Sequence, residues 1–471
     1  MLKLNKEKIK LRAYQEKTLG AIVDKNSFIV LPTGAGKTII AVALAGIKLR
    51  TGKVLVMAPT KPLVAQHKKS FDNFFENSEL IGLVDGTIKS EIRKDIWLES
   101  DLIVATPQTV VSDLEKNFFD PEKFSLVVFD EAHRTSGNYA YAKLMESIDK
   151  SQILAMSASP ATDKERLDEL RSLLKIEKFH IVDSSEMSEY LPDREIEIKK
   201  IKLNKIQIEI KKMLTDMIKE DYNILKKNRL VVRNYEYMSK GELISLNKRL
   251  FSKVSDDSKL YYFIKINTKV IKLLFLLEML ETQTNNSFLK ALEKLSTENA
   301  KSSKSIMEDF RLIRIKRLSK NLEYNNKMNE LKNLIDFDKK IIIFCQYTNS
   351  VDEIVEYINS SNIGVAKKFT GQRKGFTQKN QKKVLGEFKD GEFNVLVATS
   401  VSEEGIHVDD ADVGIFFECI PSALRSIQRR GRIGRVNIGK IYMLMTENSI
   451  DEKYYWVSKR KEENMYKLLK R

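Results

Sequence analysis

Cysteine and long apolar runs are scarce in this 471-residue chain. Its two cysteines, Cys345 and Cys419, are too few for a disulfide framework or a structural zinc site, and we expect both to be buried packing residues. No apolar run reaches the roughly 18 residues of a membrane span, and the charged N-terminal sequence has no signal-peptide core. These absences predict a protein of the reducing cytoplasm that has no membrane partner.

Length and charge indicate several domains and a polyanionic partner. The apolar content of 42% is enough for two or three well-packed domains. The net charge of +16 favours nucleic acid first and an anionic membrane second, unless a general lysine bias simply decorates every surface. Between Ile196 and Glu330 there are 29 Lys and Arg against 17 Asp and Glu, so this segment holds 12 of the 16 net charges. A general lysine bias would spread the positive charge along the whole chain. Its concentration in one segment therefore favours a polyanionic partner that binds there.

The basic segment differs from its flanks in structure as well. It has no proline, its only glycine is Gly241, and apolar residues recur at helical spacing in 206–225 and 269–281. In the flanks, short apolar runs alternate with helical stretches and end in Pro, Thr, Ser or Asp, which is typical of parallel sheets. These runs are 27–32, 53–59, 101–107, 125–130 and 152–159 before the segment, and 339–346, 365–371, 393–400, 413–418 and 440–446 after it. The predicted fold is α/β, with two similar parallel-sheet domains around a helical insert. We place their boundaries at 1–190, 191–330 and 331–455, with a tail at 456–471.

A glycine-rich loop, LPTGAGKT (31–38), follows the first predicted strand and leads into a helix. Gly34 and Gly36 let the backbone amides turn toward a phosphate, and the helix N-terminus adds a partial positive charge. Lys37 would reach the β- and γ-phosphates of ATP, and the Thr38 hydroxyl would hold Mg²⁺. Leu31 stands where the strict phosphate-loop pattern has glycine, so a chance glycine-rich turn is the alternative.

An acidic pair ends the buried run SLVVFDEAH (125–133). Asp130 would bind Mg²⁺ through water, and Glu131 would position and deprotonate the attacking water. Acidic residues often follow strands only to begin a loop. This pair gains weight because it follows a phosphate loop on another strand of the same predicted sheet.

Arginines gather in the second half of the chain, in SIQRRGRIGR (426–435). A solvated basic helix end is the alternative, but Gly431 and Gly434 would weaken a surface helix and allow close approach. Arginine geometry suits a γ-phosphate whose charge is redistributing in the transition state. Supplied from the opposite half, these arginines would make ATP a contact between two domains.

With these motifs in place, the sequence resembles the superfamily 2 helicases and translocases, which have two RecA-like domains. The likeness runs in the family's motif order from about Leu11 to Arg435. LRAYQ (11–15) is similar to the Q-type motif, PTGAGKT to motif I, APTKPLVAQH (58–67) to motif Ia and ATPQTV (105–110) to motif Ib. DEAH resembles motif II, SASPAT (157–162) motif III, FTGQ (369–372) a strand contact of the second domain, VATSVSEEGIHV (397–408) motif V, and QRRGRIGR motif VI.

The resemblance implies ATP and Mg²⁺ as cofactors and assigns roles residue by residue. The nucleotide-binding residues that it implies are Arg12, Gln15 (on adenine), Thr33, Gly34, Ala35, Gly36, Lys37, Thr38, Gly405 and His407. Thr38 and Asp130 would hold the metal, partly through water, and the catalytic set would be Lys37, Asp130, Glu131, Gln428, Arg432 and Arg435. The nucleic-acid contacts would be Pro59, Thr60, Lys61, Thr106, Pro107, Gln108, Thr370, Gly371 and Thr399. To these we add four basic residues of the insert from their charge alone: Arg311, Arg314, Lys316 and Arg317.

Within the superfamily the sequence is most similar to the archaeal Hef helicase and the Fanconi-anaemia M-type translocases, and it is also similar to the RIG-I-like and Dicer helicases. That group has a helical insert where this chain has its basic segment. The nuclease domain of Hef is not implied by the residues present. His407 departs from the family's aspartate, which is associated with the nucleotide ribose, and Ser159 replaces a common threonine.

The resulting prediction is an ATP-dependent DNA helicase or translocase, associated with the nucleoid, that acts on forked or branched DNA. Two alternatives stay open: a motor directed to double-stranded RNA, and a non-catalytic, ATP-gated binding protein. Among the histidines, we expect His133 to bridge the nucleotide and strand sites, and His67 and His180 to lie on the surface.

Overall fold

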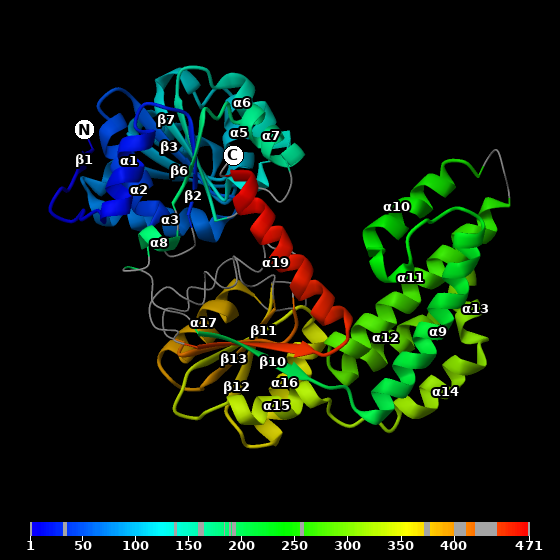
Figure 1. Ribbon diagram of the computed structural model, residues 1–471. Coiled ribbons are helices and arrows are strands. Elements are labelled where there is room, and N and C mark those ends of the chain that lie inside the picture. The colour runs from blue at the N-terminus through cyan, green and yellow to red at the C-terminus, as the bar shows by residue number, and fades with distance from the viewer. Residues whose placement is uncertain are drawn as a thin grey trace.

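The computed structural model describes residues 2–31, 35–135, 139–158, 164–182, 184–187, 190, 195–254, 259–371, 377–399, 411–419 and 440–469. Two α/β domains lie one above the other, and a helical insert projects from the side of the second (Figure 1). Within the described residues no helix is both long and apolar enough to cross a membrane. The predicted fold class is confirmed: two parallel sheets with a helical region between them in sequence.

The first domain is built on a seven-stranded sheet with the order β5-β6-β3-β7-β8-β2-β9, in which all pairings are parallel. The strands are β2 (Ser27–Val30), β3 (Lys53–Met57), β5 (Ile81–Val84), β6 (Leu102–Ala105), β7 (Phe124–Asp130), β8 (Gln152–Ser157) and β9 (Lys178–Ile181). The helices are α1 (Ala13–Ile22), α2 (Lys37–Lys48), α3 (Lys61–Phe74), α4 (Ser90–Glu99), α5 (Pro107–Glu115), α6 (Tyr139–Ser147), α7 (Lys164–Leu173) and α8 (Ser184–Met187). A small antiparallel pair joins β1 (Lys3–Leu4) to β4 (Phe75–Glu76).

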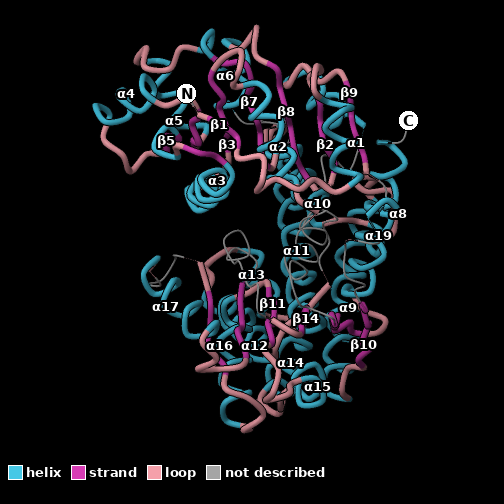
Figure 2. Tube along the Cα trace, turned by 90° about the vertical axis from the view of Figure 1, so that its left-hand side faces the viewer, coloured by secondary structure: helices cyan, strands magenta, loops and turns pink. Residues whose placement is uncertain are grey.

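Strand periodicity explains why helices cover both faces of this sheet. Successive strand residues point to opposite faces, and here both faces are apolar. Phe28 and Val30 of β2 belong to one buried cluster, whereas Ile29 between them belongs to the other. Each cluster needs a cover of helices, which gives the layered arrangement seen in Figure 2.

The second domain has a six-stranded parallel sheet with the order β10-β15-β14-β11-β13-β12. Its strands are β10 (Glu195–Ile201), β11 (Ile341–Cys345), β12 (Ala366–Phe369), β13 (Val395–Thr399), β14 (Val413–Phe416) and β15 (Lys440–Thr446). The helices are α15 (Asn326–Leu334), α16 (Thr348–Ser360), α17 (Gln378–Lys389) and α19 (Ile450–Leu469). Cys345 and Cys419 are buried in its core, as predicted.

Elements of the second domain extend beyond three of the predicted boundaries. Residues 195–201, placed in the insert, form the edge strand β10, whose whole length pairs with β15. Helix α15 was also placed mainly in the insert, yet its Met328 and Leu331 are buried in the core of the second domain. The predicted tail begins inside α19, a single helix that runs from the second domain toward the first (Figure 1).

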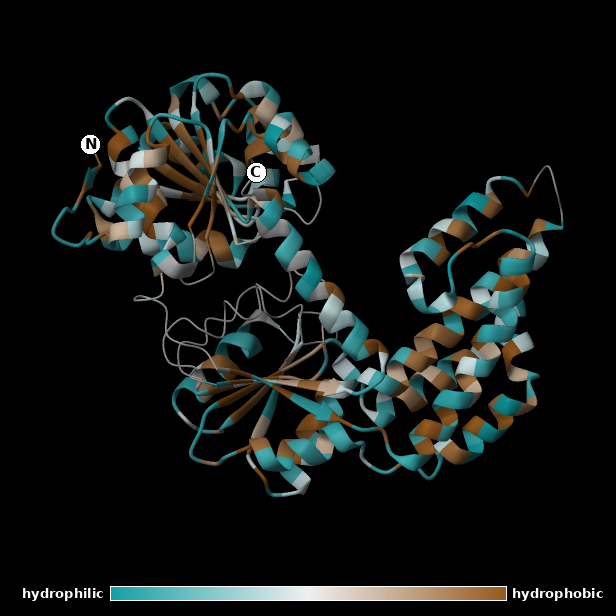
Figure 3. Cartoon of the chain, viewed as in Figure 1, coloured by the Kyte–Doolittle hydropathy of each residue, from teal (hydrophilic) through white to brown (hydrophobic). Residues whose placement is uncertain are grey.

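The insert therefore comprises α9 (Lys205–Lys227), α10 (Lys240–Phe251), α11 (Leu260–Thr282), α12 (Asn285–Thr297), α13 (Lys301–Met307) and α14 (Phe310–Ser319). Side chains of Asn204, Ser239, Thr284 and Asp309 cap four of these helices by accepting hydrogen bonds from backbone N–H groups of the first turn. The helices share one core, centred on α11 and α9. Figure 3 shows apolar residues on their facing sides and polar residues outside.

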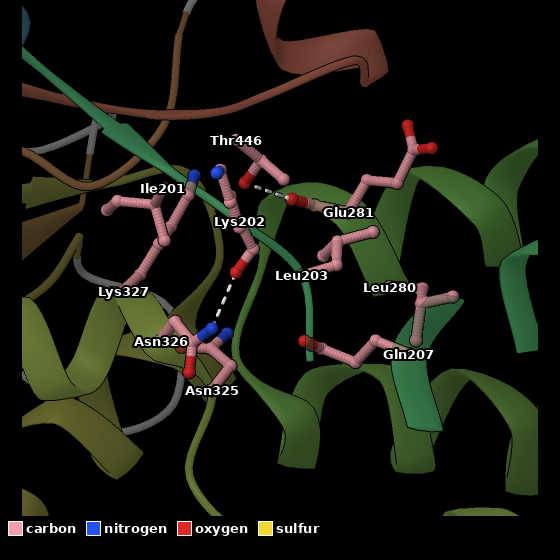
Figure 4. Close-up of a pocket in the computed structure, with 10 residues that line it drawn as sticks. All are labelled: Ile201, Lys202, Leu203, Gln207, Leu280, Glu281, Asn325, Asn326, Lys327 and Thr446. Atoms are coloured by element: carbon pink, nitrogen blue, oxygen red, sulfur yellow. Dashed lines mark hydrogen bonds between the residues drawn. The ribbon is translucent and has the colours of Figure 1, made fainter. Parts of the chain in front are cut away.

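A buried polar network fastens the insert to the second domain. The Lys327 ammonium donates to Asp451 (2.6 Å) and to the carbonyl oxygens of Thr282 and Phe417. The Asp451 carboxylate also accepts from the backbone N–H groups of Cys419 and Thr446. Beside this network a cavity of about 10 Å³, large enough for one water, is lined by residues of both parts (Figure 4). The network joins the end of α11 to strands β14 and β15, so the insert and the second domain form one connected unit.

Lys327→Met is expected to destabilise this unit by about 3–5 kcal/mol, because Asp451 would remain as an unpaired buried charge. Chemical denaturation monitored by circular dichroism measures the effect. The double variant Lys327→Met/Asp451→Leu removes both charges and should recover much of the loss. A double variant less stable than Lys327→Met alone would contradict this role for the pair.

Candidate nucleotide and nucleic-acid sites

The predicted nucleotide residues meet at one edge of the first sheet. Because all its strands are parallel, the loops after β2, β8 and β7 emerge at the same edge. Strand β8 lies between the other two, which places Ser157 between Lys37 and Asp130. The sheet order therefore brings together the phosphate loop and the acidic pair, as the sequence predicts.

The phosphate loop ends in a glycine that the backbone requires. Gly36 has φ +78° and caps α2, and a Cβ at this position would lie 2.3 Å from the Gln15 amide nitrogen. The positive φ favours glycine here, and a Cβ would also require the Gln15 side chain to move. The next residue, Lys37, donates from Nζ to the Leu31 carbonyl oxygen at 3.0 Å. Its ammonium thus lies across the loop, at the N-terminus of a 12-residue helix, where an anion is favoured.

Asp130 has a partner that the sequence analysis missed. The residue is 8% exposed, and its Oδ2 lies 2.8 Å from Nε2 of His67 on α3. His67 is buried, so the expectation of a surface position is wrong. The available signal was the spacing: Val64, His67 and Phe71 share the buried face of α3. His180 is also not fully exposed; in β9 its Nε2 lies 3.1 Å from the Thr18 hydroxyl.

Electrostatics keep Asp130 ionised and His133 neutral. Burial alone would raise the pKa of Asp130, but the adjacent His67 and Lys37 outweigh it and hold the pKa below its ordinary value. Burial, together with Arg134 and Arg166, lowers the pKa of His133 to about 4. Its Nδ1 lies 2.9 Å from the Ser157 hydroxyl and 3.3 Å from a carboxylate oxygen of Glu131. The His133 imidazole therefore links the acidic pair to the end of β8 without carrying charge at neutral pH.

Glu131 follows its strand in an unusual backbone conformation. Its φ of +50° lies in the left-handed region, and a short 3₁₀ turn, Ala132–Arg134, begins immediately after it. This turn sends the chain away from the sheet directly beyond Asp130. A strained backbone at the end of a buried strand is typical of functional sites.

The residues present fit a magnesium nucleotide. An ionised carboxylate, an ammonium group and the Thr38 hydroxyl at a helix N-terminus offer the ligands that this cation and a triphosphate need. Mg²⁺ usually takes only one or two protein carboxylates and completes its shell with water and phosphate oxygens. Accordingly, no group of three or more metal-binding side chains occurs in the part of the chain that the structure describes.

Arg12 and Gln15 lie beside the phosphate loop. The Gln15 amide oxygen accepts from the Arg12 backbone N–H at 2.9 Å, and its amide nitrogen donates to the Ala35 carbonyl oxygen at 3.3 Å. The Arg12 guanidinium lies 5.0 Å from the centre of the Tyr190 ring. Gln15 thus connects α1 to the loop, and its predicted contact with adenine stays a prediction.

The predicted nucleic-acid contacts lie at the carboxyl ends of the β-strands in both sheets. Pro59 to Lys61 follow β3 and begin α3, and Thr106 to Gln108 follow β6 and begin α5. Because β3 and β6 are neighbours, two helix N-termini lie side by side, with Lys61 and Gln108 exposed. In the second domain, Thr370 and Gly371 follow β12, and Thr399 ends its neighbour β13.

The four basic residues of the insert do not share one environment. Arg311 pairs bidentately with Glu220 (2.6 and 2.7 Å) and with Asp309, and these carboxylates raise the pKa of Arg311 above its ordinary value. Arg314 is bonded to Glu209. By contrast, Arg317 is exposed and Lys316 half-buried on α14. Arg317 and Lys316 are therefore the better candidates for phosphate contact, whereas Arg311 braces α14 against α9. Seven further predicted site residues lie outside the described residues: Thr33, Gly34, Gly405, His407, Gln428, Arg432 and Arg435.

Comparison with known proteins agrees with this geometry. Residues 8–162 match the family model "Type III restriction enzyme, res subunit", and residues 326–437 match "Helicase conserved C-terminal domain". Residues 206–325, which span the insert, match a model for the helical bundle of ATP-dependent RNA helicases. The crystal structure of the Pyrococcus furiosus Hef helicase domain superposes with a TM-score of 0.76 at 35% identity, covering 96% of this chain and 99% of that one. The chain belongs to the superfamily 2 helicases of the Hef type.

Curated relatives place this Hef-type helicase among longer proteins. A Methanocaldococcus jannaschii protein named as an ATP-dependent RNA helicase is 35% identical over 98% of the chain and 61% of its own length. The ATP-dependent DNA helicase MPH1 of Candida albicans is 29% identical over 93% of the chain and 43% of its own length. The mouse Fanconi anemia group M protein homolog is 27% identical over 98% and 26%. The chain thus spans about 60% or less of these relatives. Its domain matches place it among the helicases with two RecA-like domains.

His67→Leu is expected to weaken Mg²⁺ binding about 10- to 100-fold, because Asp130 would lose the hydrogen bond that orients its carboxylate. The measurement is the Mg²⁺ dependence of fluorescent ATP-analogue binding, which needs no turnover. His67→Gln, which retains an N–H donor, should recover part of the affinity, and His180→Leu serves as the matched control. An unchanged Mg²⁺ dependence in His67→Leu would show that Asp130 does not need this partner.

Proposed function

We propose that this Hef-type helicase is an ATP-driven motor that moves along DNA and engages forked or branched structures. The observation that supports this most is the set of residues that share the carboxyl-end edge of the first sheet. In the first domain, Lys37 and Asp130 lie on the same sheet edge as Lys61 and Gln108, so the proposed nucleotide and strand contacts share one surface. The basic insert is fastened to the second domain by the Lys327 network. We therefore expect a change at the ATP site to affect both the bound DNA strand and the DNA branch beside the insert.

In the proposed cycle, Lys37 binds the β- and γ-phosphates, and Asp130 and Thr38 bind the metal nucleotide. When bound, Mg²⁺ neutralises charge that develops on the transferring phosphate. Glu131 takes a proton from the attacking water, and Gln428, Arg432 and Arg435 act on the phosphate from the second domain. Closure on ATP and reopening after hydrolysis would let the two domains grip the strand in turn, mostly through its phosphates. DNA binding would place the protein in the cytoplasm, associated with the nucleoid.

RNA is the second candidate substrate. The Methanocaldococcus jannaschii relative and the helical-bundle family model both carry RNA helicase in their names. Several other relatives are named DNA helicases. We favour DNA because more of the relatives that match both α/β domains and the insert together are named DNA helicases than RNA helicases.

Comparing ATPase stimulation by DNA and RNA tests the substrate directly. Single-stranded, duplex, forked and four-way DNA are compared with matching RNAs at equal nucleotide concentration. Forked and four-way DNA should stimulate hydrolysis most. Stimulation by double-stranded RNA above that of every DNA would replace the DNA motor with the RNA alternative.

The double variant Lys316→Ala/Arg317→Ala is expected to weaken binding to forked DNA more than to single strands. Each lost phosphate contact lowers the slope of log affinity against log salt by about 0.9, so the slope should fall by up to about 2. Lys94→Ala, which removes an exposed lysine of α4 in the first domain, is the control for loss of a surface charge. Equal weakening on all substrates would show that α14 does not select branches.

A further inference from the structure

A groove of about 240 Å³ lies on the insert, between α10, α11 and α12. Its apolar lining comes from α11 and α12 and consists of Ile271, Phe275, Leu276, Ala291 and Leu295. A cavity of roughly 150 Å³ is enough to hold a benzene ring, so this groove has room for one flat aromatic group. Its aromatic member, Phe275, is 36% exposed, so part of its ring is accessible from the groove.

The rim of the groove is basic. Lys240 lies 5.1 Å from the centre of the Phe275 ring and is paired with buried Glu278. Lys272 donates to Glu298 at 2.5 Å and to the Ser303 hydroxyl at 2.6 Å. The third lysine, Lys294, is exposed; it makes no direct ion pair among the described residues, although its charge helps to lower the pKa of Glu298. An apolar floor with an exposed cation at its edge suits a ligand that is aromatic at one end and anionic at the other.

The position of the groove limits what could occupy it. Figure 1 shows the insert, with α10, α11 and α12, projecting beside the two α/β domains and α19. A branch of a nucleic acid held by the two α/β domains would therefore emerge near the insert. The segment that contains the groove also carries most of the net positive charge of the chain. These features favour a nucleic acid over an apolar peptide as the occupant.

We propose that the groove takes one unpaired nucleobase at the branch point, with its ring against Phe275 and its phosphate at Lys294. This inference rests on the proposed DNA function. Extruding a base from a duplex costs a few kcal/mol, but the cost is least where the base is already unpaired. Stacking on an aromatic side chain does not depend on base identity, so the site would read the structure of the branch and not its sequence.

Forked DNA carrying 2-aminopurine at successive junction positions tests the proposal. Fluorescence should rise several-fold at one or two unpaired junction positions on binding, because the base leaves the stack of its neighbours. Phe275→Ala should abolish most of that rise and weaken fork binding about five-fold or more. Phe275→Leu keeps the apolar bulk without a ring and should behave similarly, which separates stacking from folding.

Two controls make the outcome decisive. Phe310→Ala, on α14, removes an aromatic ring that is 75% exposed and lies outside the groove, and it should leave the signal intact. Lys294→Gln should lower the salt slope of fork binding by about one. A flat fluorescence response at every junction position, with fork binding and DNA-stimulated ATPase intact, would overturn the nucleobase site alone. If DNA does not stimulate the ATPase rate of the wild-type protein at all, the proposed function itself is overturned.

Discussion

Glu131→Gln is expected to bind ATP with near-normal affinity and to hydrolyse it about 10²–10⁴-fold more slowly. Glutamine keeps the size of the side chain but cannot accept a proton from the attacking water. Lys37 and Asp130, which would hold the phosphates and the metal, are left unchanged. Steady-state ATPase assays and equilibrium binding of a fluorescent ATP analogue measure the two properties separately.

Lys37→Ala is the informative contrast to Glu131→Gln. Removing the ammonium that lies across the phosphate loop should lower ATP affinity itself as well as hydrolysis. The pair of variants thus separates binding from chemistry at one sheet edge. An ATPase rate within a few-fold of wild type in Glu131→Gln would refute the assignment of Glu131 as the base.

Arg432→Ala and Arg435→Ala are expected to reduce turnover about 10³–10⁵-fold, the range typical of arginines that act on a transferring phosphate. Their charge matters most in the transition state, so ATP binding should change far less than the rate. Both residues belong to the second half of the chain, so a large effect would show that this half closes on nucleotide bound to the first. Arg460→Ala, an exposed arginine of α19, is the matched control. Normal turnover with Arg432 and Arg435 both removed would mean that the cleft does not close in this way.

Local patterns in the sequence were enough to predict most of the sheet framework. All ten apolar runs coincide with strands, because parallel strands buried on both faces are recognisable from their own residues. Strand β10 was missed because EIEIKKI alternates apolar and charged residues next to a long helical pattern. Its place is set by pairing with β15, more than 200 residues later, and no local signal records that pairing.

The site shows the same division between local and long-range information. The phosphate loop and the acidic pair were predicted because their residues are contiguous and lie at strand ends. The contact of His67 with Asp130 crosses 63 residues, so the sequence shows the two residues but not their distance. Arg311 is the opposite case: its charge was evident, but its partner Glu220, 91 residues away, was not. A count of charges therefore identified the basic segment but overstated how many of its cations are free.

The most direct test of the proposed motor is strand displacement on a forked DNA with ATP and Mg²⁺. A fluorophore and quencher on the two arms report separation of the strands in real time. The wild-type protein should separate or migrate the fork only with hydrolysable ATP, and Glu131→Gln should bind the same fork without moving it. Fork separation that proceeds equally with a non-hydrolysable ATP analogue, or unchanged in Glu131→Gln, would contradict an ATP-driven DNA motor.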